Sequence, residues 1–116
     1  MSERVSVAKT YKLYVGGAFP RSESGRSYPV TDTRGAFLAN AAQASRKDAR
    51  DAVVAARKAF AGWSAATAYN RGQVLYRVAE LLEGRRDQFV AEVSASDGVP
   101  LRRAQSIVDS SIDRWV

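Results

Sequence analysis

Small and apolar residues recur every three to four positions from residue 45 onward, which is the spacing of one face of an α-helix. Ser45 is a favourable N-cap for a first helix, with Asp48 three residues later to complete the cap, and Thr67 can begin a second helix. Gly62 is expected to end the first helix, and Pro100 suits the first turn of the last one. The pattern predicts helices over residues 46–61, 68–83, 87–94 and 101–116.

Two short stretches are expected to separate the later helices. The sequence Gly84-Arg85-Arg86-Asp87 can end one helix and cap the next at Asp87. The sequence Ser96-Asp97-Gly98 is typical of a turn. We expect no β-strand after Ser45.

The first part of the chain has a different pattern, in which short stretches of Tyr, Val and Phe alternate with Gly and Pro. Gly16-Gly17 suits a two-residue hairpin, because both central positions of a type I′ turn need positive φ. A second hairpin is expected to pair residues 27–31 with residues 36–42 around Asp32-Thr33-Arg34-Gly35. Residues 1–10 are polar and aperiodic, so we expect a mobile arm there, followed by one incomplete domain over residues 11–116.

The apolar face of the first helix is rich in alanine, which allows close approach of neighbours but buries little area per residue. Trp63 and Trp115 lie on apolar stripes and are expected to pack in a core, with an exposed patch as the alternative for Trp115 if the chain ends there. The last helix carries its stripe to the final residue without a glycine or a polar tail. We therefore expect the chain to be part of a longer polypeptide that covers these faces.

Composition narrows the possible chemistry. The 116 residues include no cysteine and no histidine, which excludes disulfides, thiol nucleophiles and the commonest general base from this chain. No run of about 18 apolar residues could span a membrane, and residues 1–12 lack the apolar stretch of a signal peptide. A cytoplasmic protein without membrane contact is expected.

The charged residues are expected to lie on solvated surfaces and not in a binding or catalytic site. The net charge is +6, but the 18 basic residues are spread along the chain, so solvated helix faces are favoured over a nucleic-acid surface. Asp48 and Asp51 lie within one turn of each other, as do Glu80 and Glu83. Both carboxylate pairs are expected on the solvated surface.

The order of these features resembles the amino-terminal region of the aldehyde dehydrogenase superfamily. The similarity rests on the aromatic-flanked Gly16-Gly17 hairpin, the alanine-rich helix that carries Phe60 and Trp63, Arg71 early in the next helix, and Gly98 with Pro100. It implies an α/β fold with amino-terminal β-hairpins, followed by a helical layer that packs on a nucleotide-binding domain. Two departures are the short turn at residues 32–35, where family members usually read Asn-Pro-x-Thr-Gly, and a valine where they commonly have the lysine of Gly-Lys-Pro.

The resemblance implies a function for the whole polypeptide and not for this segment. Members of the family oxidise aldehydes to carboxylic acids with NAD or NADP, through a catalytic cysteine and a glutamate that activates water. The catalytic and cofactor-binding residues are all expected in the remainder of the polypeptide, which would be the partner of this segment. The whole polypeptide is expected to form a homo-oligomer. The alternative is a stand-alone, non-catalytic interaction module that docks through Leu101, Val108 and Trp115.

One ligand site within the segment is also implied by the resemblance. Some members hold a monovalent cation, Na⁺ or K⁺, at positions that match the backbone carbonyls of Val30 and Thr31 and the carboxylate of Asp109. Oxygen ligands of this kind suit a hard cation. The alternative is that Asp109 simply faces water.

Overall fold

The computed structural model describes residues 9–116, so most of the arm expected over residues 1–10 lies outside the described residues. The chain divides into two compact units, Met1–Phe60 and Ala61–Val116. Each unit is described by itself below.

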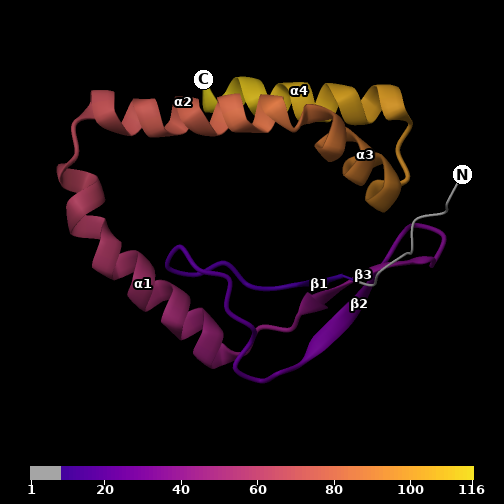
Figure 1. The fold of residues 1–116 in the computed structure, drawn as a ribbon, viewed down its shortest axis with the longest axis horizontal. Coiled ribbons are helices and arrows are strands. Elements are labelled where there is room, and N and C mark those ends of the chain that lie inside the picture. The colour runs from indigo at the N-terminus through magenta and orange to yellow at the C-terminus, as the bar shows by residue number, and fades with distance from the viewer. Residues whose placement is uncertain (1–8) are drawn as a thin grey trace, which may run out of the picture. The chain divides into compact units, whose positions relative to one another are not determined.

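The first unit contains a three-stranded sheet with the strand order β1-β3-β2 (Figure 1). The strands are β1 (Thr10–Tyr11), β2 (Ser27–Thr31) and β3 (Phe37–Ala42). β2 and β3 form the antiparallel hairpin that the sequence predicts, while β1 pairs with β3 in parallel. The ladder is irregular between Val30 and Thr31, because these residues pair with Ala39 and Phe37 and leave one extra residue on β3.

Local turn chemistry explains both hairpins. Gly16 and Gly17 have φ values of 61° and 79°, and the flanking Val15 and Ala18 exchange backbone hydrogen bonds of 3.0 and 3.1 Å. In the second hairpin, a carboxylate oxygen of Asp32 accepts hydrogen bonds of 2.9 Å from two backbone N–H groups of the turn, those of residues 34 and 36. Both predicted hairpins are confirmed.

Helix α1 (Arg46–Ala65) is longer than the sequence pattern predicts. Gly62 does not end it, because an interior glycine costs only about 1 kcal/mol relative to alanine and twenty residues of regular hydrogen bonding outweigh that cost. The chain then turns through a hydrogen bond from the Ala66 N–H to the Trp63 carbonyl and enters the next helix. The Thr67 hydroxyl caps that helix by accepting a 3.1 Å hydrogen bond from the Asn70 N–H, as predicted.

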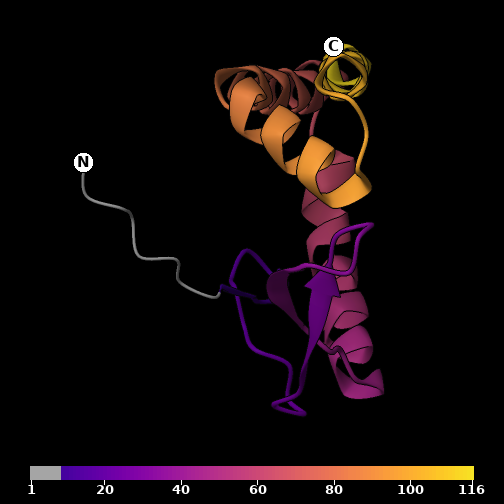
Figure 2. The same cartoon turned by 90° about the vertical axis from the view of Figure 1, so that its right-hand side faces the viewer.

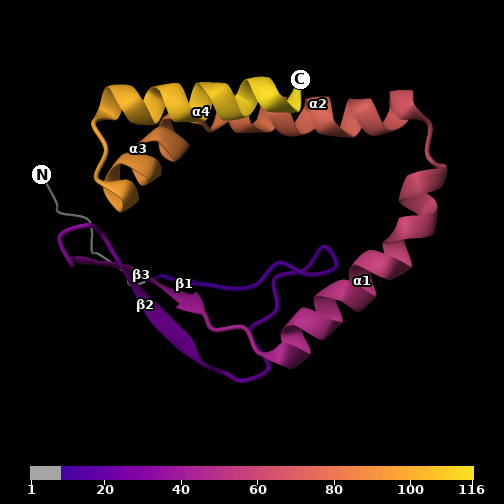
Figure 3. The same cartoon turned by 180° about the vertical axis from the view of Figure 1, so that it is seen from behind.

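The second unit contains α2 (Ala68–Gly84), α3 (Arg86–Asp97) and α4 (Leu101–Trp115). Figures 1 and 3 show α2 and α4 side by side and running in opposite directions, and Figure 2 shows α4 nearly end-on. Val90, Ala104 and Val108 are buried where α3 meets α4, and Val93, Val99 and Ile112 pack around them. No strand follows Ser45 in the described chain, as predicted.

Besides the end of α1, three helix boundaries differ from the predictions. Asp87 is not the cap of α3, because the helix already includes Arg86 and no side chain caps it. Ser96 and Asp97 belong to α3, which ends at Gly98 in the left-handed conformation, with φ of 65°. Pro100 precedes α4 as its N-cap residue and is not in the first turn. The predicted helices exist, but no side chain forms a capping hydrogen bond at the start of α3 or of α4, so the sequence carries no local signal for these boundaries.

Large apolar side chains are more exposed than the predictions assumed. Within residues 9–116 none of the large side chains is fully buried. Trp63 and Trp115 are 44% and 42% exposed, so the expectation of a core position is wrong for Trp63 in this chain, and Trp115 follows the alternative of an exposed patch. Phe60, on the same stripe as Trp63, is 68% exposed. Among the described residues, we find no helix with the length and apolar character needed to cross a membrane.

Candidate functional site

Asp48, in the first turn of α1, is the centre of the densest polar cluster in the described chain. Its carboxylate accepts hydrogen bonds from the Ser22 hydroxyl at 2.6 Å, the Ser45 N–H at 2.8 Å and the Glu23 N–H at 3.1 Å. Asp48 is only 7% exposed, which corrects the expectation that it lies on the solvated surface with Asp51. The cluster ties the loop after the first hairpin to the start of α1, and Ser22 and Asp48 are 26 positions apart in sequence.

The electrostatic environment of Asp48 favours its ionised form. The hydrogen bond from the Ser22 hydroxyl, followed by those from the backbone N–H groups of Ser45 and Glu23, lowers the pKa of Asp48 from 3.8 to about 2. A carboxylate with so low a pKa is a poor general base, so it cannot usefully activate the Ser22 hydroxyl as a nucleophile. Asp48 and Ser22 therefore form a structural pair and not a catalytic one.

Asp109 on α4 forms a bidentate ion pair with Arg86 at the start of α3. The Arg86 Nε donates to Oδ1 at 2.6 Å, and Nη2 donates to Oδ2 at 3.0 Å. These hydrogen bonds lower the pKa of Asp109 and raise that of Arg86. Because both carboxylate oxygens accept a hydrogen bond from the guanidinium, Asp109 does more than face water in this structure.

The three residues of the expected cation site lie in different units. Val30 and Thr31 belong to β2 of the first unit, at the irregular part of the ladder, and Asp109 belongs to α4 of the second. In residues 9–116, no cluster of three or more acidic side chains is arranged to hold a metal ion. The Na⁺ or K⁺ site at Val30, Thr31 and Asp109 stays a prediction.

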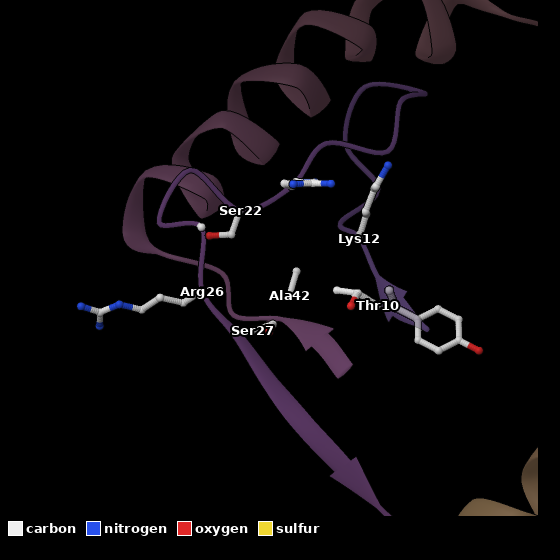
Figure 4. A pocket seen from close by; sticks show the side chains of 9 residues that line it. Thr10, Lys12, Ser22, Arg26, Ser27 and Ala42 are labelled. Atoms are coloured by element: carbon white, nitrogen blue, oxygen red, sulfur yellow. The ribbon is translucent and has the colours of Figure 1, made fainter. Parts of the chain in front are cut away.

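A surface hollow of about 350 Å³ lies in the first unit, between the start of β1, the loop before β2 and the end of β3 (Figure 4). Lys12, Arg21 and Arg26 are among its lining residues, and no carboxylate is. The remaining lining residues are mainly small or hydroxyl-bearing. The hollow has the electrostatic character of an anion site and not of a cation site.

Sequence reasoning did not find the partners in either polar cluster. Ser22 is 26 residues from Asp48, and Arg86 is 23 residues from Asp109, so no helical or strand periodicity links the members of either pair. It did find the local half of the first cluster, because the Ser45 hydroxyl accepts from the Asp48 N–H at 3.3 Å while the Asp48 carboxylate accepts from the Ser45 N–H. This is the predicted reciprocal cap.

Comparisons with known proteins give matches over almost the whole chain. The family model described as "Aldehyde dehydrogenase family" matches residues 19–115. An NAD-dependent aldehyde dehydrogenase from Sinorhizobium meliloti superposes with a TM-score of 0.88 at 26% sequence identity, over 94% of this chain and 22% of that chain.

Two further solved structures give the same result. HpcC from Thermus thermophilus matches with a TM-score of 0.89 and 29% identity, over 92% of this chain and 21% of that one. An NAD-dependent benzaldehyde dehydrogenase from Corynebacterium glutamicum matches with a TM-score of 0.83 and 30% identity, over 90% of this chain and 23% of that one. The chain thus spans less than a quarter of the length of these structures.

Proposed function

The chain belongs to the aldehyde dehydrogenase family, and from this premise we propose that it is the amino-terminal scaffold segment of an NAD(P)-dependent enzyme that oxidises an aldehyde to the carboxylic acid. The observation that carries the proposal is that nearly the whole chain superposes on less than a quarter of the length of two solved aldehyde dehydrogenases. The longer polypeptide that would contain this segment is called the intact polypeptide below.

Exposed apolar side chains on the helices support a scaffold role. On α1 the exposed stripe includes Val53 at 58% and Phe60 at 68%, and on α2 Val74 is 51% and Leu81 is 56% exposed. Burying apolar surface is worth about 25 cal/mol per Å², so exposed stripes of this extent favour a covering layer. We propose that the remainder of the intact polypeptide, including its nucleotide-binding domain, covers these helices.

The chemistry of the reaction would then belong to the remainder of the intact polypeptide. Formation of a covalent adduct with the aldehyde needs a nucleophile such as a thiolate, and this chain contains no cysteine. When bound, NAD or NADP accepts the hydride that leaves this adduct. We assign neither a catalytic nor a cofactor-binding role to any residue of the segment, whose contribution is to support the domain that positions the cofactor.

The cofactors of similar enzymes support a nicotinamide cofactor for the intact polypeptide. The Sinorhizobium and Corynebacterium enzymes are described as NAD-dependent, and PnpE was solved in complex with nicotinamide adenine dinucleotide. Another relative, a 3,6-anhydro-L-galactose dehydrogenase, was solved in complex with a ligand designated NAP. Benzaldehyde and 3,6-anhydro-L-galactose, the substrates named for two of these enzymes, differ, so the aldehyde is left open in the proposal. A homo-oligomer is the proposed assembly.

A stand-alone interaction module is the alternative, and one experiment separates the two. The transcript is sequenced beyond the codon for Val116, and the longest product of the reading frame is expressed. An in-frame extension whose product reduces NAD or NADP with an aldehyde supports the scaffold proposal. A stop codon after Val116, together with a stable monomer of 116 residues, contradicts it.

A further inference from the structure

The hollow in the first unit has the chemistry of a binding site that the dehydrogenase function does not use. Its floor is formed by short side chains, and Figure 4 shows Lys12 on one side of them and Arg26 on the other, with the Arg26 side chain pointing away from the floor. The residues labelled there are Thr10, Ser22, Ser27 and Ala42 around the floor, with Lys12 and Arg26 at the sides. Its volume of about 350 Å³ is at the small end of ligand sites, which suits a single small polar group.

The charges around this hollow are strongly one-sided. Lys12, Arg21 and Arg26 line it, and Lys9 lies beside it with its Nζ 4.7 Å from the ring centre of Tyr11, another lining residue. Within the described residues none of the three lining cations forms an ion pair. A bound anion would supply the counter-charge that these lining cations lack.

The nearby carboxylates do not supply that counter-charge. Asp48 already accepts hydrogen bonds from Ser22, Glu23 and Ser45 and is buried behind the floor residue Ser22. Glu23 accepts a hydrogen bond of 2.7 Å from the Ser45 hydroxyl. Both acidic groups are therefore engaged at the start of α1, and neither lines the hollow.

We propose that this hollow binds an oxyanion, either a phosphate or a carboxylate group, through the cationic side chains of Lys12 and Arg21. The guanidinium of Arg21 can make two parallel hydrogen bonds to such a group, and Lys12 adds a compact second charge. The hydroxyls of Thr10 and Ser27 are further donors at the floor. The oxyanion has two possible sources, a free phosphate ion or an acidic side chain of the intact polypeptide.

Calorimetric titration with inorganic phosphate, at constant ionic strength maintained with chloride, tests the first source. The sample is the full protein encoded by the reading frame that contains residues 1–116, whatever its length. Arg21→Gln removes one charge at the hollow, and Arg34→Gln is the matched control, because Arg34 is exposed in the same unit but outside the hollow. Saturable binding that is roughly tenfold weaker in Arg21→Gln, equivalent to about 1.4 kcal/mol, and unchanged in Arg34→Gln supports a phosphate site.

Thermal unfolding of the same proteins tests the second source. If an acidic side chain of the polypeptide fills the hollow, phosphate does not bind. Arg21→Gln then lowers the unfolding midpoint more than Arg34→Gln does, and the difference shrinks progressively as the pH falls below about 4, because the paired carboxylate becomes protonated only below the ordinary pKa of a free one. If Arg21→Gln does not fold, Lys12→Gln takes its place in both measurements.

The proposal is overturned if variants of the hollow and the control behave alike in both measurements. NMR spectra recorded during the phosphate titration locate the bound ion. The proposal is also overturned if phosphate binds but leaves the signals of residues 10–12 and 21–27 unchanged and shifts only those of other residues. Neither result depends on the presence of dehydrogenase activity. Failure of the oxyanion site is therefore distinguishable from failure of the proposed function.

Discussion

At the residue scale, Asp48 links two parts of the first unit through one buried carboxylate. Its hydrogen bonds reach Ser22 and Glu23 in the preceding loop and Ser45 at the helix N-cap. An asparagine at this position has the same shape but no charge, and it replaces one of the two accepting oxygens with an NH₂ group, so at least one of these donors loses its acceptor. We expect these contacts to hold the loop on α1 only while Asp48 is ionised.

Replacing Asp48 with asparagine should lower the thermal unfolding midpoint of the intact polypeptide at neutral pH. Asp51→Asn on the same helix is the control, and its effect should stay within about 0.5 kcal/mol, because Asp51 is exposed. Thermal unfolding followed by circular dichroism gives both values. Equal midpoints for the two variants would show that the Asp48 cluster does not stabilise the fold.

The pH dependence of the difference between wild type and Asp48→Asn follows from the lowered pKa of Asp48. The folded-state pKa is about 2 and the ordinary value is 3.8, so the unfolded chain binds the proton more tightly. The stability contributed by the Asp48 charge is therefore fully present above pH 3.8 and is lost as the pH falls toward 2. The gap in midpoint between wild type and Asp48→Asn should narrow across that range, and a constant gap would contradict the assignment.

The predicted cation site at Val30, Thr31 and Asp109 is tested by a different substitution. In the intact polypeptide, Asp109→Ala should lower the unfolding midpoint more in Na⁺ or K⁺ buffer than in a bulky organic-cation buffer, because only the small ions can be coordinated. Arg86→Ala is the comparison, since it breaks the ion pair with Asp109 but leaves the carboxylate in place. Equal losses for Asp109→Ala in all buffers would remove the cation site and leave the ion pair as the role of Asp109.

At the element scale, two glycines that look alike in the sequence have opposite roles. Gly62 lies within α1, where a Cβ added to it meets no atom within 4 Å. Gly98 ends α3 with φ of 65°, a conformation that costs an L-residue about 1–2 kcal/mol. Periodicity alone cannot separate these cases, because helix interior and helix end differ in backbone conformation and not in the surrounding apolar pattern.

Alanine substitutions at the two positions should change stability in opposite directions. Gly62→Ala should raise the free energy of unfolding by about 0.5–1 kcal/mol, since it reduces the entropy of the unfolded chain and adds a good helix former. Gly98→Ala should lower it by about 1–2 kcal/mol. Urea unfolding gives both values, and a stabilising effect of Gly98→Ala would show that α3 does not end in the left-handed conformation.

The elements themselves could be largely predicted from the sequence, and their partners could not. Gly16-Gly17 and the turn that begins at Asp32 specify both hairpins locally, and Ser45 and Thr67 mark two helix starts through hydrogen bonds within three residues. The parallel pairing of β1 with β3 depends on contacts about thirty residues apart, which no local pattern encodes. For the same reason, the sequence does not predict the contacts of Ser22 with Asp48 and of Arg86 with Asp109.

At the scale of the whole molecule, the helices of this chain have exposed apolar faces, on which the scaffold proposal rests. The buried residues of the two units are few and mostly small, whereas Phe60, Trp63 and Trp115 are substantially exposed. The sequence indicated this need for a cover, because alanine-rich stripes bury little area. It could not predict which large side chains are exposed in this structure, since that depends on contacts between residues far apart in sequence.

The most direct test of the scaffold proposal is reduction of the nicotinamide cofactor, followed by absorbance of the reduced ring, with several aldehydes. The intact polypeptide and the isolated 116 residues are assayed side by side at equal concentration. We expect saturable turnover from the intact polypeptide and none above the buffer blank from the isolated chain, which carries no thiolate. Saturable turnover by the isolated chain, shown free of the longer product, would contradict the account.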